Sequence, residues 1–241
     1  MDRNPQQPPV EPRRYRRVDE DRPEHNPITP ATTPSCPHRR PFELGVDIVI
    51  HSMTKYLNGH SDVVAGCVIT REQKHADKIS YLCNFAGLAC SPFDAWLVLR
   101  GLKTLGPLAW KPIKRGSMAV AQFLETHPQV AKSTTPGLTS CIRNMLLAKK
   151  QMSGFGGMLA FDVKGDAPRP KKVMTSLKLF SMAESLGGVE SLVEYPETMS
   201  HASISEQARR EAGITENTIR VSIGIEHPDD LIADMKQALE S

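Results

Sequence analysis

Short apolar runs alternate with longer amphipathic stretches from about residue 42 to the end of the chain. β-Branched runs bounded by turn residues predict buried strands at Val46–His51 and Val63–Thr70. The runs Met158–Val163 and Ile219–Ile223 predict two more strands in the second half. We therefore expect strands and helices to alternate throughout the chain, which is typical of a layered α/β fold.

Three segments between and after these runs are expected to be helices. The run Ser91–Asp94 reads as a helix start, with a serine N-cap, a proline at the first helical position and an aspartate in the first turn. A longer helix is predicted over Ile113–Glu125, because two prolines just upstream oppose an earlier start. A final helix follows Pro228, and one apolar stripe of it is expected to face the core. The stripe consists of Leu231, Met235 and Leu239.

The first 40 residues differ in composition from the rest. Ten of the 19 prolines of the chain lie within residues 1–41, and aliphatic residues are almost missing there. Such a segment cannot bury enough apolar surface to offset its ordering entropy, so we expect residues 1–40 to be a largely disordered tail rich in Pro and Arg. Its basic run Arg13–Arg17 could contact nucleic acid or a membrane surface, but the acidic run Asp19–Asp21 follows at once, and a solvated tail is the preferred interpretation.

Composition narrows the class of protein. Hydrophobic residues make up 39% of the chain and charged residues 24%, and the net charge of +3 is too small to argue for a nucleic-acid partner. No apolar stretch approaches the ~20 residues that span a bilayer, and the N-terminus has no apolar signal region. The five cysteines form no CxxC pair, so neither a disulfide framework nor a metal site is expected. A cytoplasmic protein with reduced thiols fits these features.

Candidate chemistry lies directly after the first predicted strand. Ser52 and Thr54 stand at alternate positions before Lys55, and strand ends in α/β sheets are where ligands bind. Two hydroxyls beside a lysine suit a phosphorylated aldehyde cofactor, with Lys55 forming the Schiff base and the hydroxyls bonding the phosphate. The short pattern alone is weak, because a lysine after a strand is more often an ordinary surface lysine.

The longer segment that contains these three residues is far more specific. SMTKYLNGHSDVVAG, at residues 52–66, resembles the cofactor-lysine segment of the Cys/Met-metabolism family of pyridoxal-phosphate (PLP) enzymes, and within it the cystathionine γ-lyases and γ-synthases. The resemblance covers residues 41–241 in family order. Its further motifs lie at residues 91–94, 100–105, 151–158, 183–192, 199–203 and 219–224.

This resemblance implies a fold and a division of the chain. The expected fold is α/β, the C-terminal part of the PLP-dependent transferase fold (fold type I), without most of the N-terminal cofactor domain. Residues 41–127 are expected to be a three-layer α/β remnant of the large PLP-binding domain, with the cofactor lysine and a connecting helix. Residues 128–241 are expected to be a smaller α/β substrate-binding domain.

The second half supplies candidate substrate residues. Strand alternation places Arg220 on the face opposite its apolar neighbours, and a mid-strand arginine needs an anionic partner, either a structural salt bridge or a ligand carboxylate. The resemblance implies the ligand, because the matching family arginine holds the substrate's α-carboxylate. It also implies that Ser185 helps to hold that carboxylate, that Glu184 is linked to substrate preference, and that Ser200 replaces a usual threonine.

One departure from the family concerns the cofactor ring. Members carry an aspartate about 25 residues before the lysine that keeps the pyridine nitrogen protonated and the ring an electron sink. Here the corresponding stretch is Pro30–Thr33, which contains no acid. The chain is therefore expected to be a truncated and impaired form that binds PLP weakly through Lys55.

The function implied is a carbon–sulfur lyase of trans-sulfuration, cleaving cystathionine by γ-elimination to cysteine, 2-oxobutanoate and ammonia. A lyase is preferred to a synthase because Ser91–Asp94 resembles the lyases more closely. A cystathionine γ-synthase or a homoserine-ester sulfhydrylase remains an alternative, and so does a non-catalytic remnant or interaction subunit. The expected partners are an amino-acid substrate and further copies of the chain, since family members are usually tetramers, with no nucleic acid and no membrane.

Overall fold

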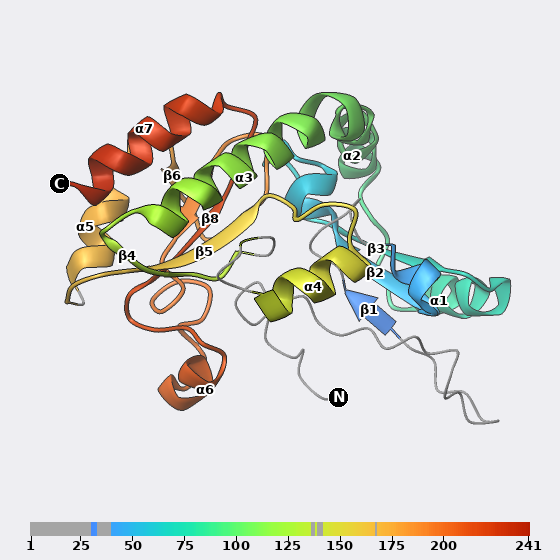
Figure 1. Cartoon of the computed structure of the whole chain (residues 1–241). Helices are drawn as coiled ribbons and strands as arrows, with labels where there is room; N and C mark the ends of the chain where they lie inside the picture. The colour runs from blue at the N-terminus through green and yellow to red at the C-terminus, as the bar shows by residue number, and fades with distance from the viewer. Residues whose placement is uncertain (1–29, 33–39, 136–137, 139–141, 167) are drawn as a thin grey trace.

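The protein contains two β-sheets with helices packed around them, as the computed structural model in Figure 1 shows. The structure describes residues 30–32, 40–135, 138, 142–166 and 168–241. The smaller sheet has the order β1-β2-β3 and the larger one the order β4-β5-β8-β7-β6. The α/β fold class predicted from the alternating pattern is confirmed.

The smaller sheet carries the strand that leads into the candidate lysine. Strand β1 (Pro30–Thr32) runs parallel to β2 (Ile48–Ser52), and β2 is antiparallel to β3 (Gly66–Thr70). Strand β1 lies within residues 1–40, the stretch expected to be a largely disordered tail, and its three residues are ordered by pairing with β2. The other residues of the predicted tail, up to 39, lie outside the described residues.

Strand β3 is shorter and much more exposed than the apolar run Val63–Thr70 predicts. The side chains of Val68 and Ile69 are 45% and 43% exposed, and Cys67, expected to be buried, is only partly so. The expectation of a buried strand is therefore wrong here. Strand β3 is the edge of its sheet, and an apolar run states only that a segment can be covered, not that a neighbour covers it.

The larger sheet is formed by the C-terminal half. Strand β8 (Thr218–Ser222) lies at its centre, antiparallel to β5 (Met158–Val163) on one side and to β7 (Leu192–Glu194) on the other. Strand β4 (Val130–Ser133) pairs with the outer side of β5, and β6 (Ser181–Met182) runs parallel to β7. Both strands predicted in this half are present, with β8 shifted by one residue from Ile219–Ile223.

Helices join and cover the two sheets. In the helix starting at Pro92, the Ser91 hydroxyl accepts the backbone N–H of Asp94 at 3.5 Å, which confirms the predicted N-cap. The predicted helix over Ile113–Glu125 begins two residues earlier, because a π-helical turn, η4, carries the chain from α2 directly into α3. The helices are α1 (Gln73–Phe85), α2 (Pro92–Thr104), η4 (Leu105–Trp110), α3 (Lys111–Thr126), α4 (Ile142–Gln151), α5 (Pro168–Ser176), α6 (Glu206–Glu211) and α7 (Pro228–Leu239), with the short turn η2 (Pro41–Leu44) before β2.

Among the described residues, no helix is both long and apolar enough to cross a membrane.

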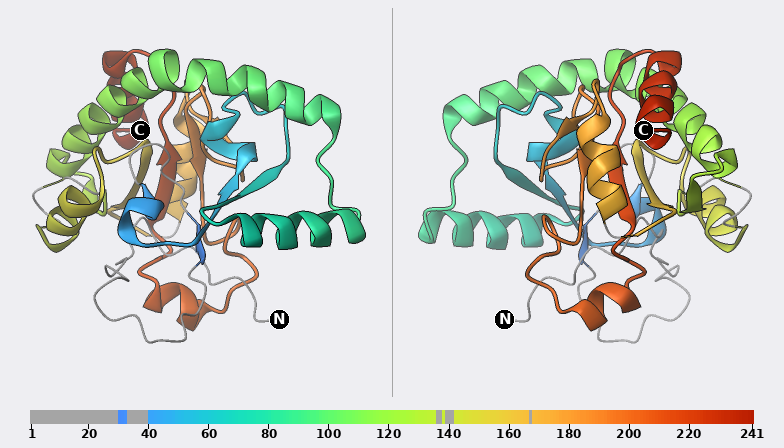
Figure 2. Two further views of the ribbon diagram at one scale, coloured as in Figure 1. Left: turned by 90° about the vertical axis from the view of Figure 1, so that its right-hand side faces the viewer. Right: turned by 90° about the vertical axis from the view of Figure 1, so that its left-hand side faces the viewer.

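Helix α3 runs across the molecule from the smaller sheet to the larger one, as both views in Figure 2 show. Helix α7 packs beside it over the larger sheet (Figure 1).

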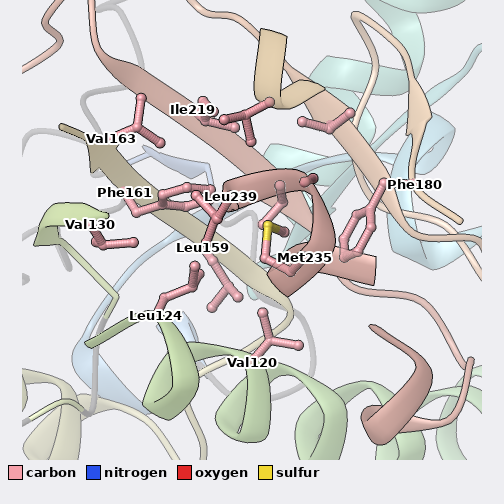
Figure 3. Packing of buried hydrophobic residues seen from close by; sticks show 14 of the residues in the cluster. Val120, Leu124, Val130, Leu159, Phe161, Val163, Phe180, Ile219, Met235 and Leu239 are labelled. Atoms are coloured by element: carbon pink, nitrogen blue, oxygen red, sulfur yellow. The ribbon is translucent and has the colours of Figure 1, made fainter. Parts of the chain in front are cut away.

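The main hydrophobic core lies between the larger sheet and these helices (Figure 3). The predicted apolar stripe of α7 is confirmed, since Leu231, Met235 and Leu239 are fully buried. Asp234 of the same helix is also buried, and its carboxylate accepts the backbone N–H groups of Lys178 and Leu179 at 2.8–3.1 Å. The loop before β6 is thereby tied to the helix by hydrogen bonds to a charged group, which are stronger than neutral ones.

Replacing Phe161 with alanine tests this core. Phe161 of β5 is 1% exposed, so Phe161→Ala should lower the free energy of unfolding by about 3–5 kcal/mol through lost apolar burial and the cavity left behind. Urea denaturation of the purified chain measures the change. The matched control is Leu99→Ala on α2, where the side chain is 62% exposed and the change should stay within about 0.5 kcal/mol. Equal losses in the two variants would contradict the placement of the core.

Candidate active site

Lys55 lies in an irregular turn at the end of β2. The turn η3 (Met53–Leu57) has π-helical hydrogen bonding, and Lys55 itself has non-helical angles, with φ −92° and ψ −147°. The backbone N–H of Gly59 donates to the Lys55 carbonyl at 2.9 Å and closes the turn. Single π-helical turns occur often at functional sites, because the extra residue re-aims a side chain. The geometry places the lysine off the end of the strand, as the sequence predicts.

The Lys55 amine points to a segment 130 residues away. Its Nζ donates a hydrogen bond to the Ser185 hydroxyl at 2.8 Å. Partial burial lowers the pKa of Lys55, the positive charge of Arg220 lowers it further, and the negative charges of Glu194 and Glu184 oppose this effect. A lysine with a lowered pKa holds more of its amine in the unprotonated, nucleophilic form near neutral pH.

The two hydroxyls before the lysine are used differently. Thr54 Oγ1 accepts the backbone N–H of Ala65 at 3.1 Å and donates to the Ala65 carbonyl at 3.4 Å, so this hydroxyl fastens η3 to the segment before β3. Ser52 is exposed, and its hydroxyl makes no hydrogen bond with the described residues. Of the two predicted phosphate ligands, Ser52 is therefore the one with a hydroxyl free for a ligand.

Arg220 has a protein partner that the sequence does not reveal. It lies on β8 directly opposite Glu194 of β7, and its Nη1 donates to Glu194 Oε1 at 3.1 Å. The Ser200 hydroxyl donates to the same oxygen at 2.8 Å. The arginine side chain is 17% exposed and that of the glutamate 1%. The predicted residues Arg220 and Ser200 are thus brought together by one buried carboxylate.

Tyr56, next to the lysine, anchors the turn in the second half of the chain. Its ring is buried, and its hydroxyl donates to the Ile223 carbonyl at 3.1 Å. The ring meets Trp110 edge-on with centroids 5.5 Å apart. Desolvation raises the pKa of Tyr56, so the hydroxyl stays protonated as a donor. The signal in the sequence is an aromatic residue beside a polar lysine, and it is too common to identify such an anchor.

A glycine of the 183–192 loop, Gly187, lets the loop approach this anchor. Gly187 has φ +101°, its N–H donates to the Ser222 hydroxyl at 3.0 Å, and a Cβ on it would lie 3.2 Å from the Tyr56 ring. A side chain on Gly187 would be strained and crowded at once. This close approach sets Ser185, two residues earlier, against the lysine.

Metal chemistry has no candidate among the described residues, where no group of three or more His, Cys, Asp or Glu side chains could hold an ion. The cysteines Cys67, Cys83 and Cys90 are free thiols, and burial raises the pKa of Cys67. Cys36 and Cys141 lie outside the described residues.

The tight packing around Tyr56 can be tested at Gly157. A Cβ on Gly157 would collide with the Tyr56 hydroxyl and lie 2.6 Å from Cγ2 of Ile113, so Gly157→Ala should destabilise the chain by about 1–3 kcal/mol. Urea denaturation measures the loss. Gly106→Ala is the matched control, because a Cβ there meets no atom within 4 Å. A Gly157→Ala chain as stable as the control would show that the glycine is not needed for the anchor.

The charges around Lys55 predict shifts of opposite sign. Arg220→Gln removes a positive charge and should raise the pKa of Lys55, whereas Glu184→Gln removes a negative charge and should lower it further. The measurement is the pH dependence of Lys55 labelling by an amine-reactive reagent, read by peptide mass spectrometry. Shifts in the same direction in both variants would contradict this electrostatic account.

Comparison with known proteins identifies the family. The sequence profile of the "Cys/Met metabolism PLP-dependent enzyme" family matches residues 28–240. The chain is 46% identical over 202 residues to a cystathionine γ-lyase of Dictyostelium discoideum and 42% identical over 203 residues to the cystathionine γ-synthase of Escherichia coli strain K12. In both cases the match covers 84% of this chain and 52% of the relative, so the chain spans about half the length of the curated relatives it matches.

Solved structures agree with the sequence match. A cystathionine γ-lyase from Lactobacillus plantarum, complexed with L-serine, superimposes with a TM-score of 0.85 at 36% identity, covering 90% of this chain and 57% of that one. A cystathionine γ-synthase from Xanthomonas oryzae pv. oryzae, in complex with cystathionine, gives a TM-score of 0.81 at 40% identity over 84% of this chain and 52% of that one. The match in sequence and fold covers the turn η3 with Lys55, the loop with Gly187 and strand β8 with Arg220. The chain belongs to the Cys/Met metabolism family of PLP-dependent enzymes.

Proposed function

We propose that this chain carries the lysine and the carboxylate-binding residues of a trans-sulfuration enzyme that cleaves cystathionine by γ-elimination. The products are cysteine, 2-oxobutanoate and ammonia, with one water consumed. The observation that carries the proposal is the Lys55 amine, which donates to Ser185 and whose pKa is lowered by burial and by the charge of Arg220. An amine and an arginine within electrostatic range of one another suit the two charged ends of an α-amino acid.

The residues present fit PLP, the cofactor of the family. An aldehyde reacts with an unprotonated amine, which the lowered pKa of Lys55 favours, and the free Ser52 hydroxyl can donate to a phosphate. Thr54 would add a second hydroxyl only by giving up its bond to the Ala65 carbonyl. When bound, PLP supplies an electron-withdrawing ring that stabilises negative charge at the substrate's α-carbon.

The chain's own residues divide the remaining work. Arg220 and Ser185 hold the α-carboxylate of the substrate, and Lys55 Nζ moves protons between its α- and β-carbons. Glu184 is exposed beside Ser185 and influences Lys55, which supports a role in selecting the distal part of the substrate. Ser200 acts on the carboxylate site through Glu194 and not through a bond to Arg220.

A β-elimination is favoured by a different observation. Relatives named cystathionine β-lyase, from Coxiella burnetii and Lactococcus lactis, are 48% identical to this chain, as similar as the γ-lyases. That reaction would give homocysteine, pyruvate and ammonia from the same substrate. We retain γ-elimination because the helix start Ser91–Asp94 resembles the γ-lyases, and the two reactions differ in their keto-acid product.

The division of the chain is part of the proposal. Residues 41–127, with the smaller sheet, belong to a PLP-binding domain, and residues 128–241, with the larger sheet, to a substrate-binding domain. We further propose that the working enzyme is a cytoplasmic homo-oligomer. Large exposed apolar side chains on α1 and α2 support association, among them Phe85, Phe93 and Trp96.

Keto-acid release from L-cystathionine, with PLP present, tests the reaction. A chimera of residues 41–241 with the part of the Dictyostelium γ-lyase that this chain does not match should release 2-oxobutanoate, and Lys55→Ala should abolish the release. The control Lys103→Ala, in an exposed position of α2, should retain it. We expect the 241-residue chain alone to release none, since Pro30–Thr32 offers no acid for the cofactor ring and residues acting as a unit fail together.

The product that is released distinguishes the candidate reactions. Pyruvate in place of 2-oxobutanoate would establish the β-lyase. If the chimera releases no keto acid from L-cystathionine, a second assay with cysteine and an activated homoserine follows, and cystathionine formation in it would establish the synthase. Keto-acid release that persists in Lys55→Ala would refute the role of the lysine.

A further inference from the structure

Glu194 is a charged residue in a place where charges are costly. It ends β7, and it is fully buried in the sheet, directly opposite Arg220 of β8. Removing a carboxylate from water costs several kcal/mol unless a partner charge and hydrogen bonds compensate. A neutral side chain of similar volume would fill the same space without that cost. The presence of a carboxylate therefore indicates a role beyond packing.

Two side chains converge on one oxygen of this carboxylate. Arg220 Nη1 donates to Oε1 at 3.1 Å, and the Ser200 hydroxyl donates to the same atom at 2.8 Å. The Ser200 hydroxyl also lies 2.8 Å from His201 Nδ1, in a segment folded back after β7. The carboxylate is thereby fixed from the loop side as well as from the neighbouring strand.

Only one N–H group of the Arg220 guanidinium is bonded to Glu194. A structural ion pair between buried groups is best satisfied by two parallel hydrogen bonds. Here the second oxygen, Glu194 Oε2, and Arg220 Nε are both buried without a hydrogen-bond partner among the described residues. One nitrogen is bonded to one oxygen, and the other N–H groups of the guanidinium make no hydrogen bond with the described part of the chain.

The pair lies within electrostatic range of the lysine. Arg220 and Glu194 act on the pKa of Lys55 in opposite directions, which requires that both charges be near its amine. The third charged group acting on the amine is Glu184, on the loop that carries Ser185. A carboxylate bound by Arg220 would therefore be held near the amine of Lys55.

We propose that Glu194 is a positioning residue, which fixes the Arg220 guanidinium beside the Lys55 amine through Nη1, is itself fixed by Ser200, and leaves the remaining N–H groups of the arginine to a substrate carboxylate. The proposal rests on the role of Arg220 in the proposed function. Glu194 makes no hydrogen bond to the Lys55 amine, and the role proposed for it is exerted through the position of the arginine.

Glu194→Asp is the informative change, because it keeps the negative charge and shortens the side chain by one methylene. If Glu194 fixes Arg220, the guanidinium shifts, its influence on the amine weakens, and the pKa of Lys55 rises. The readout is the pH dependence of Lys55 labelling in the full 241-residue chain. We expect labelling below the pKa to slow by about twofold or more. In the Arg220→Gln background the slowing by Glu194→Asp should be lost, because only the direct charge interaction of the carboxylate with the amine then remains.

Two further variants keep the test decisive. Ser200→Ala removes the second bond to Glu194 without touching the ion pair, and should slow labelling in the same direction even if Glu194→Asp fails to fold. Asp234→Asn is the matched control, a buried carboxylate on α7 that bonds only backbone N–H groups and Gln237, and it should leave Lys55 labelling unchanged.

Unchanged labelling in Ser200→Ala and Glu194→Asp, or an equal effect without Arg220, would overturn the positioning role. The labelling does not depend on turnover. An inactive chimera would therefore count against the proposed function and leave this result standing, and the reverse also holds.

Discussion

The burial of Tyr56 is the constraint on which the rest of the site depends. The residue follows Lys55 in the chain, and its ring packs against Trp110 while its hydroxyl donates to the Ile223 carbonyl in the C-terminal half. A lysine on a free turn would sample many positions. Because its neighbour is fixed in the core, the lysine is delivered at one place, and glycines at 157 and 187 provide the space that the ring occupies.

The site also depends on the register in which strands β7 and β8 pair. Glu194 and Arg220 face one another because β7 and β8 pair with Leu192 opposite Ser222, and Ser222 in turn accepts the N–H of Gly187. Side chains alternate between the two faces of a strand, so a slip of one residue would move all of these groups to the wrong face. The apolar residues on the other face, Ile219 and Val221 among them, hold the register through their burial against α3 and α7.

Local patterns in the sequence predict the elements well where local chemistry decides them. The N-cap at Ser91, the stripe of α7 and the strand Met158–Val163 all follow from residues within one turn or one strand. The contact of Lys55 with Ser185 follows only from the family resemblance, since 130 residues separate them. The partner of Arg220 could not be predicted, because the sequence does not state which strand lies beside which. The predicted burial of Val68 is wrong for the same reason, because the exposure of a residue on an edge strand depends on which segments lie beside that strand.

The place of β8 in the larger sheet has a consequence for biosynthesis. It is the last strand in the described chain, but it lies at the centre of its sheet, between β5 and β7. During translation the earlier strands of this sheet emerge first and cannot pair with one another across the gap that β8 fills. The larger sheet can therefore close only after β8 has left the ribosome, and the edges of its earlier strands stay available to chaperones, or to misassembly, until then.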